Sequence, residues 1–293
     1  MATLRETKDR IASVRSTLKI TGAMKLVASA KLRKAQQAVE AMLPYQRELQ
    51  ATLRIVQAAL PKAAPEQEPF FPETTPETGR RTALVLVSSN SSLCGAFNAN
   101  AIRCALEQIR AIETSGAEVD VYALGRKGAD ALRKLGHPSL FDGIALVAHP
   151  AYEGASALAA QLMEAHEEGR YDRVLLVYNH FVSSASQQTR CETWLPFEPE
   201  HAADGVETAD PEAYIMEPSA RELHEKLLPQ LTRLNLYTVL LDSVAAEHAA
   251  RTRAMQTATD NAERLLSELT LEYNKGRQQK ITAEILDLMG GAQ

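Results

Sequence analysis

The sequence predicts an α/β protein in which long N- and C-terminal helices form an antiparallel coiled coil that flanks a Rossmann-like α/β domain. Three observations lead to this fold class. Residues from Leu4 to Met42 carry an apolar repeat at spacings of three and four, which is typical of a coiled-coil helix. The middle of the chain alternates apolar runs with helical patterns, as parallel α/β folds do. The stretch from Asp242 to Leu288 keeps a helical pattern without a proline.

The first element is a helix over 1–60 whose seam combines apolar, small and polar residues. Its members are Leu4, Thr7, Ile11, Val14, Leu18, Thr21, Lys25, Ala28, Leu32, Ala35, Val39 and Met42. The seam is imperfect because two Thr and one Lys lie within it. Pro44 lacks a backbone N–H, so it is expected to kink or break the helix.

A Pro- and Glu-rich stretch at 61–79 is expected to be a linker, and an α/β domain is expected over 80–197. Continuous apolar runs such as Thr82–Ser88 predict strands that are buried on both faces. The expected strands are Thr82–Ser88, Val119–Ala123, a short one at Ile144–Ala148, Arg173–Asn179 and an edge strand at Gln188–Phe197. The expected helices are Ala96–Glu113, Arg126–Leu135 and Glu153–Glu168.

An acidic linker at 198–218 precedes the C-terminal coiled-coil helix, 219–293. Ser219 is a plausible N-cap, with Glu222 three positions after it, and Pro229 is expected to interrupt the helix. The unbroken pattern from Asp242 to Leu288 corresponds to roughly 70 Å of helix. A helix of this length needs a partner, and the N-terminal helix folded back antiparallel is the obvious one. The C-terminal seam is rich in small residues, so little apolar area is buried along it.

The net charge and its distribution along the chain limit the classes of partner that the protein can bind. The net charge of −5 argues against a general nucleic-acid binder. Residues 1–35 are nevertheless strongly basic, which fits either a solvated helix face or docking against an acidic protein surface. No apolar run is long enough to span a membrane, and no signal peptide is recognisable. Three cysteines without CxxC spacing favour a reducing compartment.

A Rossmann-like domain is typical of nucleotide-binding enzymes, which carry a GxGxxG motif in the loop after the first strand. Here that loop, Ser88–Gly95, has a single glycine at its end. Gly125-Arg126-Lys127-Gly128 lacks the ending of a P-loop, and the histidines have no metal-ligand spacing. We therefore expect no catalytic, cofactor or metal site. Two alternatives stay open: a nucleotide-binding Rossmann-type enzyme with a coiled-coil dimerisation element, and a coiled-coil adaptor.

Motifs at both ends of the chain carry a resemblance to a known family. Near the C-terminus are Thr259-Asp260-Asn261-Ala262, then Asn274-Lys275…Arg277-Gln278…Ile281-Thr282, then Gly290-Gly291-Ala292. Near the N-terminus, KITGAMKLVASAKLRKAQ runs from Lys19 to Gln36. These motifs, together with the loop Ser89–Asn98, resemble the γ subunit of F-type ATP synthase, the central rotor shaft. Asn90 and Ser92 replace the Asp and Gly that are usual in that loop.

The resemblance implies a rotor that couples proton flow to ATP synthesis or hydrolysis on the β subunits and has no catalytic site of its own. The implied partners are the α and β subunits of the catalytic ring, the ε subunit and the membrane c-subunit ring, without nucleic acid and without direct membrane insertion. The implied location is the cytoplasmic face of the bacterial inner membrane. Carried over by motif, the partner contacts are Met24, Lys25, Arg277, Gln278 and Thr282, with Leu286, Leu288 and Met289 in an apolar bearing at the tip.

Overall fold

The computed structural model describes residues 3–60, 81–197 and 213–290, except for the side chains of Leu288 and Gly290. The predicted linker 61–79 and most of the predicted linker 198–218 lie outside the described residues. The chain forms two compact units. We call residues 31–250 the α/β unit, and residues 1–30 together with 251–293 the coiled-coil unit. The finer division into five segments stays a prediction.

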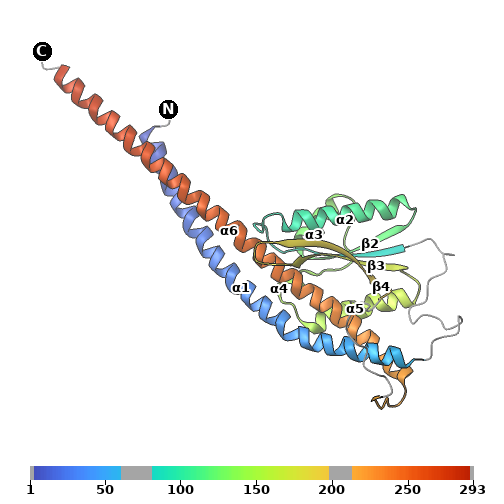
Figure 1. Cartoon of the computed structure of the whole chain (residues 1–293). Helices are drawn as coiled ribbons and strands as arrows, with labels where there is room; N and C mark the ends of the chain where they lie inside the picture. Colours follow the sequence, from blue (N-terminus) through green and yellow to red (C-terminus); the bar gives the residue numbers. More distant parts are fainter. Residues whose placement is uncertain (1–2, 61–80, 198–212, 291–293) are drawn as a thin grey trace. The chain divides into compact units, whose positions relative to one another are not determined.

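The α/β unit is built on a four-stranded sheet with the order β2-β1-β3-β4 (Figure 1). β1 pairs in parallel with β2 and β3, whereas β4 is antiparallel to β3. The predicted strands at these four places are confirmed. Their bounds are β1 Arg81–Val87, β2 Glu118–Leu124, β3 Arg173–Phe181 and β4 Gln187–Leu195.

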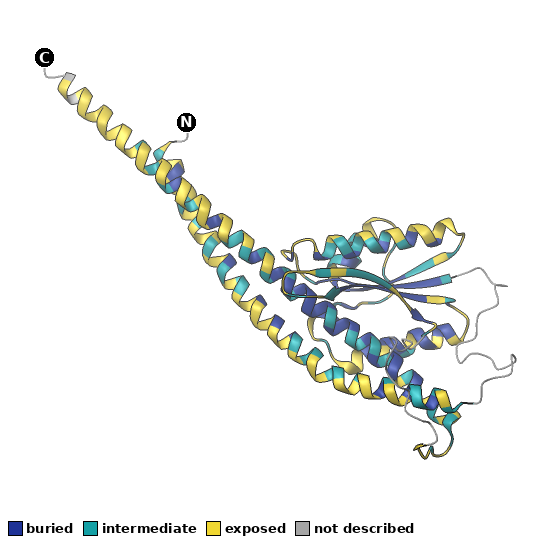
Figure 2. Ribbon diagram, viewed as in Figure 1, coloured by how far each residue is buried: buried dark blue, intermediate teal, exposed yellow. Residues whose placement is uncertain are grey.

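Helices cover both faces of the sheet. On one face, α2 (Phe97–Thr114) and α3 (Arg126–Lys134) pack against Leu84, Leu86 and Val121. On the other face, α5 (Tyr152–Glu167) and parts of the two terminal helices pack against Val85, Leu176 and Tyr178. Figure 2 shows the buried residues of this unit concentrated in the strands and in the helix faces turned toward them. This arrangement explains why β1 is apolar along nearly its whole length.

The predicted strand at Ile144–Ala148 is wrong, because this segment is the short helix α4 (Ile144–Ala148). Only Leu146 and Val147 of its five residues are buried, whereas β1 is buried along nearly its whole length. Gly143 lies just before the helix, and a Cβ there would come within 2.7 Å of the Leu124 Cα atom. A short apolar run does not distinguish a strand from a buried helical turn.

The terminal helices lie within the predicted segments 1–60 and 219–293 and are less interrupted than predicted. α1 runs from Leu4 to Ala59 through Pro44, and α6 runs from Ala220 to Gly290 through Pro229. The interruption predicted at Pro229 is therefore wrong, and α1 is not broken at Pro44, although a proline inside a helix costs about 3 kcal/mol. Packing offsets this cost, because Leu49 and Leu53 follow Pro44 into the core, and Leu228 and Leu231 flank Pro229 there. The predicted cap is confirmed: Glu222 N donates to Ser219 Oγ at 3.2 Å.

The coiled-coil unit pairs the first part of α1 with the last part of α6. Thr21 Oγ1 lies 3.0 Å from Thr259 Oγ1, and Lys25 Nζ lies 2.8 Å from Gln256 Oε1. A Cβ at Gly276 would lie 3.1 Å from Leu4 Cδ2. In these contacting pairs, the residue number on α6 falls as the residue number on α1 rises. The two helices are therefore antiparallel, which confirms the predicted antiparallel coiled coil. The predicted α1 seam positions in this unit are all buried or half-buried.

Candidate partner-binding surface

The seam of the coiled-coil unit mixes small and polar residues with larger apolar ones such as Leu18 and Leu269. Among its most buried members are Thr7, Thr21 and Ala28 on α1, and Met255 and Ala262 on α6. Small side chains let the two backbones approach closely but remove little apolar area from water. The unit therefore gains only modest stability from its own seam.

The first predicted contact pair, Met24 and Lys25, lies half-buried on α1. Lys25 faces α6, where its ammonium donates to Gln256 Oε1. Gln256 Nε2 in turn donates to Asp260 Oδ1 at 2.6 Å. Lys25 is thus both a seam residue and part of a polar chain that crosses between the helices.

The second predicted set, Arg277, Gln278 and Thr282, is exposed on α6. Thr282 Oγ1 donates to the Gln278 backbone carbonyl at 2.9 Å. The set follows Gly276, which lies beside Leu4. The structure therefore does not bring the two sets together, because the helix from Leu4 to Lys25 separates them by about 30 Å.

The predicted tip residues lie where α6 extends past the start of α1. Leu286 and Met289 are 63% and 71% exposed. The side chain of Leu288 lies outside the described residues. The helix continues to Gly290 although α1 begins at Leu4, beside Gly276. The last turns of α6 are consequently a single helix with apolar side chains in water.

Further exposed apolar residues on this unit were missed by the sequence reasoning. Together with the tip residues they form what we call the exposed apolar set: Ile20, Leu26, Val27, Leu265, Leu271, Ile281, Ile285, Leu286 and Met289, each at least 44% exposed. The sequence could have indicated them, because residues such as Leu26 and Leu271 are apolar but lie outside the predicted seam positions. An excess of large apolar side chains exposed on one unit indicates a binding region.

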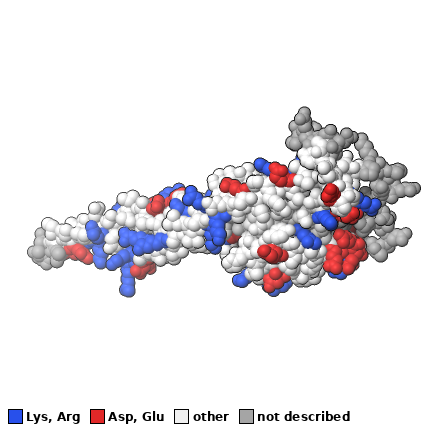
Figure 3. Space-filling view, turned by 90° about the horizontal axis from the view of Figure 1, so that it is seen from below, with Lys and Arg blue, Asp and Glu red and all other residues white. Residues whose placement is uncertain are grey.

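Basic residues accompany the exposed apolar set. Arg5, Lys8, Arg10, Arg15 and Lys19 on α1 are all exposed, and none forms a salt bridge with another described residue. Figure 3 shows Lys and Arg side chains along the coiled-coil unit on the face in view. A surface that is both apolar and basic suits a partner that offers apolar contacts and carboxylates.

In the α/β unit, the loop after β1 occupies the amides that a phosphate would need. The N-terminal amides of α3 bind this loop: Arg126 N donates to Asn90 Oδ1 at 3.0 Å, Lys127 N to the Ser89 carbonyl at 3.0 Å, and Gly128 N to Ser88 Oγ at 2.9 Å. A helix N-terminus binds anions through these same groups. Asn90, one of the two unusual residues of the loop, also donates to the Ile144 carbonyl at 2.8 Å.

Cys104 on α2 and Cys191 on β4 both have environments that lower the reactivity of their thiols. Burial, together with the neighbouring Cys104 and Glu192, raises the pKa of the Cys191 thiol to about 11. Burial also raises the pKa of Cys104. Thiols with raised pKa values hold little thiolate at neutral pH, so these are poor nucleophiles.

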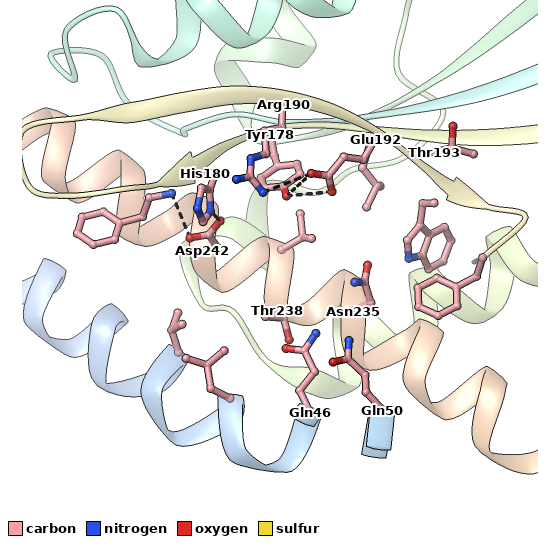
Figure 4. A pocket seen from close by; sticks show the side chains of 17 residues that line it. Gln46, Gln50, Tyr178, His180, Arg190, Glu192, Thr193, Asn235, Thr238 and Asp242 are labelled. Atoms are coloured by element: carbon pink, nitrogen blue, oxygen red, sulfur yellow. Dashed lines mark hydrogen bonds and ion pairs between the residues drawn. The ribbon is translucent and has the colours of Figure 1, made fainter. Parts of the chain in front are cut away.

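A cleft of about 690 Å³ in the α/β unit lies between the sheet and the terminal helices (Figure 4). Its charged side chains bind one another: His180 Nδ1 lies 2.7 Å from Asp242 Oδ2, and Glu192 accepts from Tyr178 and contacts Arg190. Burial raises the pKa of Asp242, and the bond from His180 opposes this shift. These pairs join β3 to α6 and β4 to β3, so they serve the packing of the unit.

Comparison with known proteins identifies the family. Residues 3–293 match the family model described as ATP synthase. A protein of Bacteroides thetaiotaomicron named ATP synthase gamma chain is 44% identical over all of this chain and 99% of its own length. A gamma chain of Bacteroides fragilis is 46% identical with the same coverage. The chain belongs to the ATP synthase gamma-chain family.

Solved structures show the same fold as this gamma-family chain. A chain of the Euglena gracilis mitochondrial ATP synthase is 19% identical, has a TM-score of 0.63, and matches 98% of this chain and 93% of its own length. A chain from the central stalk and c-ring structure of the Tetrahymena thermophila mitochondrial ATP synthase is 23% identical, with a TM-score of 0.55 and coverage of 82% and 99%. Among the described residues, no helix has both the length and the hydropathy that a membrane span requires.

Proposed function

We propose that this chain is the rotating central-stalk γ subunit of a proton-translocating F-type ATP synthase. Family membership supports its assignment to that complex. The observation that carries the proposal is the exposed apolar set on the coiled-coil unit. Exposing these side chains to water is unfavourable, and burying them in a surrounding ring of α and β subunits would stabilise the complex.

In this proposal the chain performs no bond chemistry. Proton flow turns the membrane c ring, and the c ring and the ε subunit hold the α/β unit. The coiled-coil unit turns inside the ring and contacts each β subunit in succession, through Met24, Lys25, Arg277, Gln278 and Thr282. A ligand or partner shifts an equilibrium only through differential contacts with its states, and an asymmetric shaft provides such differences. The complex would lie at the cytoplasmic face of the bacterial inner membrane.

The alternative of a nucleotide-binding Rossmann-type enzyme has less support. Such an enzyme needs free amides at a helix N-terminus for the phosphates. The amides of Arg126, Lys127 and Gly128 are instead bound by the loop after β1. Equilibrium dialysis of the free chain with Mg²⁺ and ATP should accordingly detect no stoichiometric micromolar binding.

Affinity purification from solubilised native membranes tests the proposal. The tagged chain should recover the α, β, ε and c subunits. Leu271→Asp should lower recovery of α and β, because it places a carboxylate in the exposed apolar set. Leu140→Asp is the matched control, since Leu140 is a comparably exposed leucine of the α/β unit, at 60% against 72%. Failure to recover α and β with the unchanged chain would overturn the proposal.

A further inference from the structure

A lysine in a coiled-coil seam needs an acceptor, and Lys25 has one on the facing helix. Its ammonium lies half-buried and donates to Gln256 Oε1 at 2.8 Å. Gln256 lies just after the seam residue Met255, which is 4% exposed. A polar group at a seam position commonly fixes the register of a coiled coil at some cost in stability.

The orientation of the Gln256 carboxamide is dictated by its two neighbours. An ammonium can only donate, and an ionised carboxylate can only accept. Gln256 therefore turns its oxygen toward Lys25 and its NH₂ group toward Asp260, where the Nε2 to Oδ1 distance is 2.6 Å. Both ends of the amide are engaged, so the side chain is held in one rotamer.

We propose that Gln256 is a positioning residue: it holds the Lys25 ammonium in place for the partner subunit and fixes the register of the two helices there. This inference rests on the proposed function. An ammonium has three N–H donors, and Gln256 takes one of them. A direct ion pair between Lys25 and Asp260 would neutralise the charge, whereas the intervening amide keeps the ammonium available to a carboxylate.

A second contact reinforces the register. Thr21 Oγ1 and Thr259 Oγ1 meet at 3.0 Å, one helical turn from the Lys25 contact. Sliding one helix by a single residue moves it about 1.5 Å, which would break both contacts. The neighbouring seam residues Ala28 and Ala262 are too small to resist such a shift by interlocking. The polar contacts are thus the part of this seam that specifies one alignment.

The contact itself is tested in the full-length free chain by amide hydrogen exchange of residues 251–265. Gln256→Leu and Lys25→Met should each speed exchange by about fivefold, since each removes one charge-assisted hydrogen bond at a half-buried site. The double variant should exchange no faster than either single one. Gln256→Glu keeps an acceptor for Lys25 but loses the donor to Asp260, so it should exchange more slowly than Gln256→Leu and faster than the unchanged chain. Additive effects of the two single variants would overturn the proposal whatever the function of the chain.

The positioning role is tested in the assembled complex in vesicles, as proton pumping per ATP hydrolysed. Gln256→Leu should lower this ratio by at least about threefold, and Gln256→Glu should lower it too, because its carboxylate would neutralise the Lys25 ammonium. Gln279→Leu is the matched control, because Gln279 is an exposed glutamine of the same helix. Normal pumping by Gln256→Leu would overturn the positioning role. A chain that shows the coupled exchange effect but binds no catalytic subunits would instead refute the proposed function.

Discussion

The α/β unit and the coiled-coil unit bury different kinds of side chain. The first encloses large residues such as Leu162, Leu176 and Trp194, each at most 2% exposed. The second buries Thr21, Ala28 and Ala262 and leaves the exposed apolar set in water. Since stabilisation follows the apolar area removed from water, the α/β unit can fold by its own core. The coiled-coil unit leaves much more of its apolar area exposed.

A Leu→Ala substitution is expected to change the free energy of unfolding very differently in the two units, and this is the largest expected difference. Leu162→Ala should lower the free energy of unfolding by about 2–5 kcal/mol, because it opens a cavity in the core. Leu271→Ala, at a position that is 72% exposed, should change it by no more than about 0.5 kcal/mol. Urea unfolding of the free chain measures both. Equal losses would mean that the two units are not stabilised differently.

Alkylation tests how well the α/β unit shields its interior. With a pKa of about 11, Cys191 should react with iodoacetamide at pH 8 on the order of a hundredfold more slowly than an ordinary thiol. Its rate should rise with pH, because the thiolate is the reacting form. Mass spectrometry of the native chain measures the rate, with the urea-unfolded chain as the control. Equal rates in the two states would contradict the buried environment.

Arg277→Ala and Gln278→Ala test whether exposed residues of the coiled-coil unit act in partner binding and not in folding. Both residues are exposed, so the melting of the free chain should not change. The hydrolysis rate of the assembled complex should fall by about tenfold, because a partner carboxylate or amide loses its hydrogen bonds. Circular dichroism and a steady-state ATPase assay give the two readings. A large drop in melting temperature with normal turnover would make these residues fold determinants.

The smallest expected effect concerns two glycines in the coiled-coil helices. Gly22→Ala should stabilise the chain by about 0.5–1 kcal/mol, because a helix interior favours Ala and nothing lies within 4 Å of the new Cβ. Gly276→Ala should gain less, since its Cβ would lie 3.1 Å from Leu4 Cδ2. Thermal melts of the two variants compare them. A larger gain at Gly276 would show that Leu4 is not held against α6.

Periodicity predicted the elements whose packing is regular. The seam from Leu4 to Met42 and the apolar strands were readable because one face, or both faces, of each element is buried along its length. The helices are not broken at Pro44 or interrupted at Pro229, because the cost of a proline is local, whereas the packing that offsets it comes from distant segments. Ile144–Ala148 was misassigned because five residues are too few to show a period.

The residues of the candidate partner-binding surface were harder to predict from the sequence than the fold. Arg277 and Gln278 stand out because their polarity interrupts a helical pattern, and Met24 and Lys25 were found by motif resemblance. Gln256 carries no signal in the sequence, since its role depends on Lys25 on a helix far away along the chain. Leu26 and Leu271 resemble core residues, and only the geometry of the seam reveals that they face water.

The unpaired end of α6 has a consequence for assembly. Among the described residues α1 begins at Leu4, which lies beside Gly276, and a helix end without packing frays more readily than a packed one. The residues up to Gly290 would therefore gain order from whatever encloses them. In the proposed complex, these last turns would lose most of their motion only once the ring of α and β subunits surrounds them.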